Sequence, residues 1–313
     1  MVAGSNHKNK PQYNGINLLK YVMAYAVVTI HLCGIEKWTL PWYVEWLIRQ
    51  AVPFYFMASG FLMGRNTHEL SIYETQKYYL NRGENLIKIY GVWLLIYLPL
   101  AIYKYWGNVT YVQALWDYGV SIVINGESPL AWPLWFVYSL GIYCICTSYS
   151  INNVRKMHIM ALILFLLYLM QPPYSRVLSA GIYALCGLML SRVREVDKYF
   201  WSIFILVPLS IVMYKIDIPF SEIIGGMAFM LLGMRAQLPQ TKIWGILRIE
   251  SAWIYFTHMY VIVFVYLLQC HSPYNYDKLH VISVTFFLCG LLGYFLFKAQ
   301  KVPRLQALGK LIK

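Results

Sequence analysis

Charged side chains are scarce in this chain of 313 residues, because Asp, Glu, Lys and Arg together make up only 12% of it. Acidic residues are the scarcer kind, with 13 against 26 basic residues. Hydrophobic residues reach 59%, and the mean hydropathy of +0.52 is far above that of an ordinary soluble domain of this size. The composition therefore excludes a soluble fold and indicates a polytopic membrane protein.

Several other signals are missing as well. The six cysteines have neither paired metal-ligand spacing nor a dense disulfide pattern, so we interpret them as small core side chains and expect no metal site. A removable signal peptide is not expected, since no cleavage motif follows a short apolar core. Without repeats or a polar linker, residues 1–313 are expected to form a single membrane domain, with a polar tail at 1–14 and a basic tail at 299–313.

Apolar runs of membrane-spanning length predict an all-α protein with about ten transmembrane helices. The predicted spans lie near residues 17–35, 47–64, 86–104, 132–150, 158–171, 176–191, 199–215, 219–235, 251–269 and 279–298. The fifth and sixth are short, and Pro172 and Pro173 separate them.

Basic residues divide unevenly between the two sides of this arrangement. With a cytoplasmic N-terminus, the asymmetry is about three to one and agrees with the positive-inside rule. The few outer basic residues are Lys37, Arg49, Lys104, Arg176, Lys215 and Lys278. An even number of spans then places both termini in the cytoplasm. This topology accounts for most of the net charge of +13, so we expect membrane lipids and not nucleic acid around the chain.

His31 lies inside an apolar run, where a titratable side chain is costly and usually serves a function. Lys20 precedes it by eleven residues, which places both on nearly the same face of a helix, about 16 Å apart along the axis. A long ligand entering from the cytoplasm could leave a phosphate at Lys20 and extend its reactive end to His31. Alternatively, Lys20 reaches the lipid headgroups and His31 bonds a core carbonyl.

Further cations follow the second predicted span, among them Arg65, Arg82 and Lys88. Their side chains suit the phosphates of a donor and suit anionic lipid headgroups equally well. On the outer side, the segment 104–131 combines aromatic rings with carboxylates such as Glu127, a mixture typical of sugar binding and of an interfacial aromatic belt. In the second span, Ser59 and Gly60 offer small surfaces against which another helix can pack closely.

Four sequence motifs follow one another along the chain. Asn-Gly-Ile-Asn-Leu-Leu-Lys at 14–20 leads to His31, and Val-Pro-Phe-Tyr-Phe-Met-Ala-Ser-Gly-Phe-Leu follows at 52–62. Pro-Leu-Trp-Phe-Val at 133–137 and Ser-Ala-Trp-Ile-Tyr-Phe-Thr-His at 251–258 come later. Together they resemble the acyltransferase-3 family of integral-membrane O-acyltransferases over essentially the whole chain.

The resemblance implies transfer of an acyl group, usually acetyl, from cytoplasmic acetyl-CoA to a hydroxyl of a glycan, a lipid-linked sugar or another exported acceptor. Acyl-CoA would be a co-substrate, and no bound cofactor is expected. We expect no esterase-like domain after the membrane domain, and we therefore expect the membrane domain itself to recognise the acceptor.

The resemblance also implies roles for single residues. His31 matches the histidine taken as catalytic, as a general base or as the carrier of an acyl group. Lys20 stands where the family has an arginine, and Arg82 matches one of a pair of arginines whose second member is displaced to Lys88 or replaced by Arg65. The acceptor-binding or secondary candidates are Glu36, Ser59, Glu127, Trp135 and His258.

Two other functions stay open at this point. The same membrane fold could move a small polar molecule or glycan without chemistry, since intramembrane charges also line transport pathways. The protein could also act as a structural scaffold in a glycan-assembly complex. The pairing of His31 with cytoplasmic cations favours the enzyme, and the resemblance indicates a bacterial inner membrane.

Overall fold

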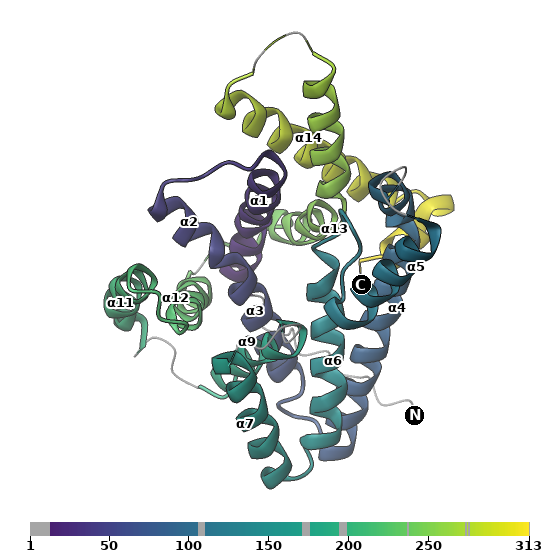
Figure 1. The fold of residues 1–313 in the computed structure, drawn as a ribbon. Coiled ribbons are helices and arrows are strands. Elements are labelled where there is room, and N and C mark those ends of the chain that lie inside the picture. Colours follow the sequence, from purple (N-terminus) through teal and green to yellow (C-terminus); the bar gives the residue numbers. More distant parts are fainter. Residues whose placement is uncertain are drawn as a thin grey trace.

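The computed structural model describes residues 13–105, 110–170, 176–193, 199–236, 238–272, 274 and 276–312. Within these ranges the chain is helical and contains no β-strand, which confirms the prediction of an all-α fold (Figure 1). Most of the predicted N-terminal tail, residues 1–12, lies outside the described residues, as do Pro172 and Pro173.

The helices follow the predicted apolar runs closely. The α-helices are α1 (Asn14–Glu36), α2 (Trp42–Arg49), α3 (Ala51–Asn66), α4 (Ile72–Tyr105), α5 (Tyr111–Val120), α6 (Leu134–Ser150), α7 (Val154–Met170), α8 (Arg176–Ser179), α9 (Gly181–Leu190), α11 (Ile203–Lys215), α12 (Ser221–Arg235), α13 (Ile243–Cys270) and α14 (Lys278–Ala299). Short η segments cover η1 (Ser121–Asn125), η2 (Phe200–Ser202) and η3 (Pro303–Lys310).

Four helices of the described chain, α1, α4, α13 and α14, are long and apolar enough to cross a membrane. The other apolar helices are shorter, so the count of ten spans and the cytoplasmic position of both termini stay predictions. Large apolar side chains are exposed along α7, α11 and α14, for example Leu162, Phe204 and Phe287. Exposed apolar faces of this kind are expected where helices meet lipid.

Helix α4 begins well before the apolar run that predicted it, at Ile72 and not near residue 86. Its start is a capping box: the Ser71 backbone N–H and hydroxyl donate to the Glu74 carboxylate at 2.9 and 2.7 Å, and the Glu74 N–H donates to the Ser71 hydroxyl. The polar residues that follow are therefore helical, and Arg82 lies on α4 and not in a loop.

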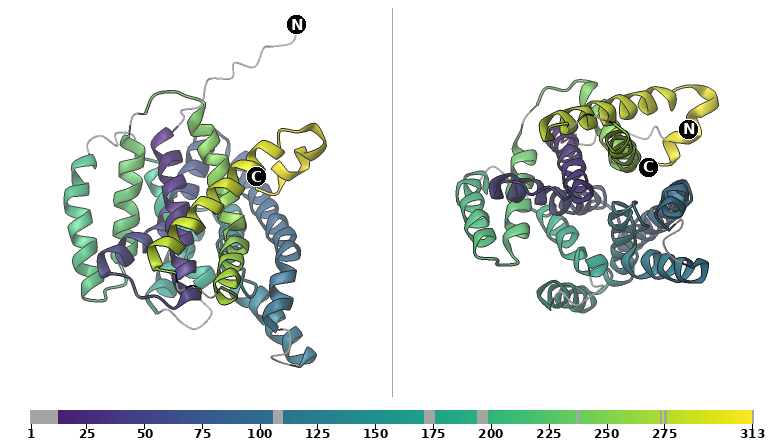
Figure 2. Two further views of the ribbon diagram at one scale, coloured as in Figure 1. Left: turned by 90° about the horizontal axis from the view of Figure 1, so that it is seen from above. Right: turned by 45° about the horizontal axis from the view of Figure 1, so that its top comes forward.

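Helix α1 lies among other helices and packs chiefly against α13 and α12, with smaller contacts to α2 and α3 (Figure 1). Around it, α4 packs on α6, α3 on α9, α11 on α12, and α14 on α13. The short helix α2 runs across the end of α1 and not alongside it (Figure 2). A side chain on α1 consequently faces other helices along most of its length.

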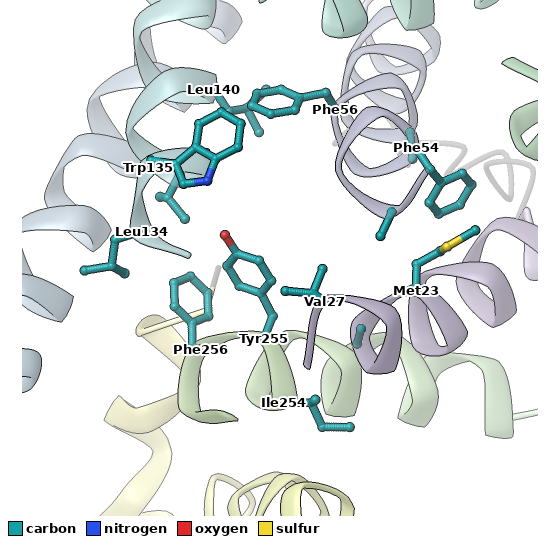
Figure 3. Close-up of a cluster of buried hydrophobic side chains, with 14 of the residues drawn as sticks. Met23, Val27, Phe54, Phe56, Leu134, Trp135, Leu140, Ile254, Tyr255 and Phe256 are labelled. Atoms are coloured by element: carbon teal, nitrogen blue, oxygen red, sulfur yellow. The ribbon is translucent and has the colours of Figure 1, made fainter. Parts of the chain in front are cut away.

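Aromatic side chains fill the core between these helices. Figure 3 shows Val27 of α1, Phe56 of α3, Trp135 of α6 and Tyr255 of α13 converging on one region. The Tyr255 hydroxyl donates to the Pro133 carbonyl just before α6. A buried tyrosine of this kind joins helices because its ring packs in the core while its hydroxyl donates to a carbonyl of another segment.

Glycines allow the close approach of α3 and α9, as the sequence predicted for Gly60. A Cβ atom built on Gly60 would lie 1.9 Å from the Ala184 carbonyl oxygen, and one on Gly187 would lie 2.0 Å from the Met57 carbonyl oxygen. The neighbouring Ser59 donates its hydroxyl to the Tyr55 carbonyl of its own helix at 2.8 Å.

We predict that Gly60→Ala destabilises the protein, because the added methyl group meets the rigid backbone of α9. Such overpacking costs about 1–3 kcal/mol. The matched control is Gly91→Ala in α4, where nothing lies within 4 Å of the added atom. Thermal unfolding of the detergent-solubilised protein should show a lower midpoint for Gly60→Ala alone, and equal midpoints would contradict the close packing.

Candidate functional site

A cavity of about 820 Å³ lies at the end of the bundle where α1 finishes. Its wall is formed by the second half of α1, by α2, by the starts of α3, α6 and α9, and by the junction between α11 and α12. His31 belongs to this wall. Because the lining residues Arg49 and Asp217 are exposed, the cavity opens to the surroundings of the protein at this end.

The half-buried ring of His31 has two cyclic neighbours. The His258 ring from α13 stacks on it with centroids 5.3 Å apart and 27° between the planes, and the Trp132 ring lies 5.7 Å away. These contacts place the imidazole between α13 and the segment before α6, with access to the cavity. The sequence candidates His31 and His258, far apart in the chain, are thus neighbours.

His258 is completely buried. Its Nδ1 lies 3.0 Å from the Ile254 carbonyl oxygen, and because a carbonyl only accepts, the proton must be on Nδ1. The Nε2 atom is then a hydrogen-bond acceptor, and it is buried without a partner in the described structure. Burying a polar atom without a hydrogen-bond partner is costly. The Nε2 atom of His258 is therefore a second polar group of note close to His31.

At the other end of α1, cations gather. Lys20 is half-buried, and the positive charges of Arg248 on α13 and Arg82 on α4 lie close enough to interact with it. The Tyr55 hydroxyl donates to the Lys20 carbonyl at 2.5 Å and ties α3 to this part of α1. Three like charges repel one another in a half-buried site, so an anion bound among them would be stabilised.

The two remaining donor-binding candidates have other surroundings. Arg65 at the end of α3 donates from Nη2 to the Val193 carbonyl at 3.0 Å, and its guanidinium lies 5.5 Å from the Phe61 ring. Since Phe61 also contacts Tyr13 just before α1, Arg65 lies near the start of that helix. Lys88 is exposed on α4, and no contact in the described structure joins it to Lys20.

Among the acceptor candidates, Trp135 is buried and lines the cavity (Figure 3). Glu36 and Glu127 are described but do not line it. Glu127 follows η1, where the Ser121 hydroxyl donates to its backbone carbonyl at 2.8 Å. The structure therefore brings Trp135 to the wall that holds His31, and it leaves both carboxylates outside.

One helix thus carries an anion-attracting cluster near its start and a cavity-lining imidazole near its end. A family model described as "Acyltransferase domain" matches residues 13–312, nearly the whole chain. The chain belongs to the acyltransferase-3 family. Searches of curated proteins and of solved structures returned no match. Membership makes it a membrane acyltransferase, and the resemblance carried by the four motifs is confirmed.

Several residues of this acyltransferase were not singled out from the sequence. Arg248 lies near Lys20 although more than 200 residues separate them in the chain. The cavity wall also holds polar residues that no motif contains, namely Glu45, Arg49, Tyr183, Asp217 and Glu222. Arg49 carried a usable signal, because it is one of the few basic residues that the sequence predicts on the outer side.

Cysteines placed at the two ends of α12 can show which side of the membrane the cavity faces. We predict that a membrane-impermeant maleimide added to right-side-out vesicles labels Asp217→Cys, which precedes α12 at the cavity mouth. Lys242→Cys, which follows α12 at the opposite end, should react only after permeabilisation. Peptide mass spectrometry separates both sites from the exposed native Cys146 and Cys270. The reverse pattern would invert the predicted topology.

Proposed function

We propose that this acyltransferase transfers an acyl group, by default acetyl, from cytoplasmic acyl-CoA to a hydroxyl group of a cell-surface glycan, a lipid-linked sugar or another exported acceptor. The observation that carries the proposal is the arrangement along α1. Lys20 with its cationic neighbours lies near one end of the helix, and His31 lines an open cavity near the other. The host membrane is proposed to be a bacterial inner membrane.

The donor is proposed to bind with its phosphates at Lys20, Arg82 and Arg248. Guanidinium and ammonium groups bind phosphates through charge-assisted hydrogen bonds. Along the axis, about 16 Å separate Lys20 from His31. Acyl-CoA has a matching shape, because its long pantetheine arm separates the phosphates from the thioester. Arg65 and Lys88 are assigned supporting positions at the same face of the membrane.

His31 is proposed to act as the general base. Its neutral imidazole accepts the proton of the acceptor hydroxyl as that oxygen forms a bond to the thioester carbonyl carbon. The carbon–sulfur bond then breaks, and the leaving CoA sulfur takes the proton back from the imidazolium. The products are an acyl ester and free CoA. In a variant of this scheme, the imidazole carries the acyl group before the acceptor attacks.

His258 is proposed to position His31. Its stacked ring limits the orientations that the His31 imidazole can adopt, since both rings lie between packed helices. The buried Nε2 of His258 adds a hydrogen-bond acceptor close to His31. Trp135 forms part of the cavity wall on the other side.

We predict that His31→Ala lowers the turnover number for CoA release at least about 100-fold, the usual contribution of a general base. The matched control, His271→Ala, removes an exposed histidine at the end of α13 and should retain wild-type turnover. Purified protein in lipid nanodiscs with labelled acetyl-CoA and a thiol reagent provides the measurement. Wild-type turnover in His31→Ala would overturn the proposal, and sugar flux without any CoA release would favour a transporter.

For the donor site, we predict that Lys20→Ala and Arg248→Ala each raise the KM for acetyl-CoA about tenfold, as expected when a hydrogen bond to a charged group is lost. Lys20→Arg should retain a KM close to that of the wild type, because the positive charge is kept. The control is Lys242→Ala, which removes an exposed charge at the same end of the bundle. If all four variants had the same KM for acetyl-CoA, the donor phosphates would have to bind elsewhere.

A further inference from the structure

The cavity beside His31 carries information about the acceptor. Its volume of about 820 Å³ lies within the range usual for small-molecule sites, about 300–1,000 Å³. It opens at the end of α1 opposite the cationic cluster, so a donor bound at Lys20 and an acceptor in the cavity approach His31 from different ends. The cavity is therefore large enough, and correctly placed, to hold the group that receives the acyl.

Aromatic rings form much of the cavity wall. Trp38, Trp135, Tyr168, Tyr183 and Tyr214 line it from five separate segments. Two of the tyrosine hydroxyls are engaged, since Tyr168 donates to the Pro219 carbonyl and Tyr183 donates to Glu222. These residues consequently offer ring faces more than hydroxyl groups. Ring faces pack well against the C–H faces of a sugar.

The charges in the wall have the opposite sign to those at Lys20. Three carboxylates line the cavity, from Glu45, Asp217 and Glu222, against one guanidinium, from Arg49. Arg49 is already paired, because its Nη2 lies 2.8 Å from the Glu45 carboxylate. The cavity therefore carries net negative charge. Carboxylates accept hydrogen bonds from hydroxyl groups and repel anions, and the repulsion grows where the protein excludes water.

Glu222 is held by a hydrogen bond between two helices. Its Oε2 accepts a hydrogen bond of 2.6 Å from the Tyr183 hydroxyl, which joins α12 to α9. Asp217 lies in the turn before α12 with φ of 56°, a left-handed conformation that Asp and Asn adopt more readily than most residues. The Glu222 carboxylate is therefore held at the cavity by Tyr183, and the turn places Asp217 at the cavity wall. Both residues can be changed to amides of the same shape.

We infer that this cavity is the acceptor site and that it takes an uncharged sugar and rejects an acidic one, with Glu222 and Asp217 setting the preference. The inference rests on the proposed function, since it assigns the second substrate of the same reaction. It assigns acceptor recognition to α2, α9 and the α11–α12 junction, and not to the segment 104–131, for which the sequence left sugar binding and an aromatic belt both open.

The test compares two acceptors of equal ring size, methyl glucoside and methyl glucuronide, with labelled acetyl-CoA and protein in nanodiscs. For the wild type, kcat/KM should be at least tenfold higher for the glucoside. Glu222→Gln and Asp217→Asn should each raise the KM for the glucoside, together about tenfold, as expected when hydrogen bonds to charged groups are lost. In the double variant, the ratio of kcat/KM for the glucoside to kcat/KM for the glucuronide should also be smaller than in the wild type. The KM for acetyl-CoA should not change.

Glu74→Gln is the matched control. It makes the same chemical change at the start of α4, outside the cavity, where glutamine also completes a capping box. A glucuronide preference, an unchanged preference in the double variant, or no transfer to either sugar would overturn the acceptor assignment. The proposed function fails separately, if the wild type releases no CoA in a His31-dependent manner even with water as the acceptor.

Discussion

The cost of burying polar groups away from water is the constraint on which this structure depends. A helix that carries both an ammonium group and an imidazole cannot turn them towards lipid without a large penalty. Helix α1 carries Lys20 and His31, and it packs against α13, α12, α2 and α3. This position places Lys20 near Arg82 and Arg248 at one end, and it places His31 in the wall of a cavity at the other.

The charged side chains near the two ends of α1 differ in sign. Near its start, Lys20, Arg82 and Arg248 form a site that favours an anion. Near its end, Glu45, Asp217 and Glu222 give the cavity the opposite sign. The two ends of one helix thus carry charges of opposite sign, and under the proposed function the imidazole of His31 lies where an extended donor and a cavity-bound acceptor meet.

Tight packing keeps these groups in place. The backbones of α3 and α9 touch at Gly60 and Gly187, and the hydroxyl of Tyr55 on α3 bonds to the Lys20 carbonyl. The stacked pair of His31 and His258 joins α1 to α13. Because Tyr255 on α13 also bonds to the Pro133 carbonyl before α6, contacts among α1, α3, α6, α9 and α13 hold the site together.

Local features of the chain were readable from sequence because they depend on neighbouring residues. Apolar runs placed the helices, although the polar start of α4 escaped notice because hydropathy ignores capping. Spacing along α1 placed Lys20 and His31 on one face, since helix geometry is fixed. The motif at 251–258 gave a reason to consider His258 but not its contact with His31. The sequence by itself therefore determined the helical class, the family and the residues of α1. Tertiary structure alone decided that Arg248 joins Lys20, that Glu127 stays outside the cavity and that Glu222 enters it, because contacts between distant helices depend on how side chains pack in three dimensions.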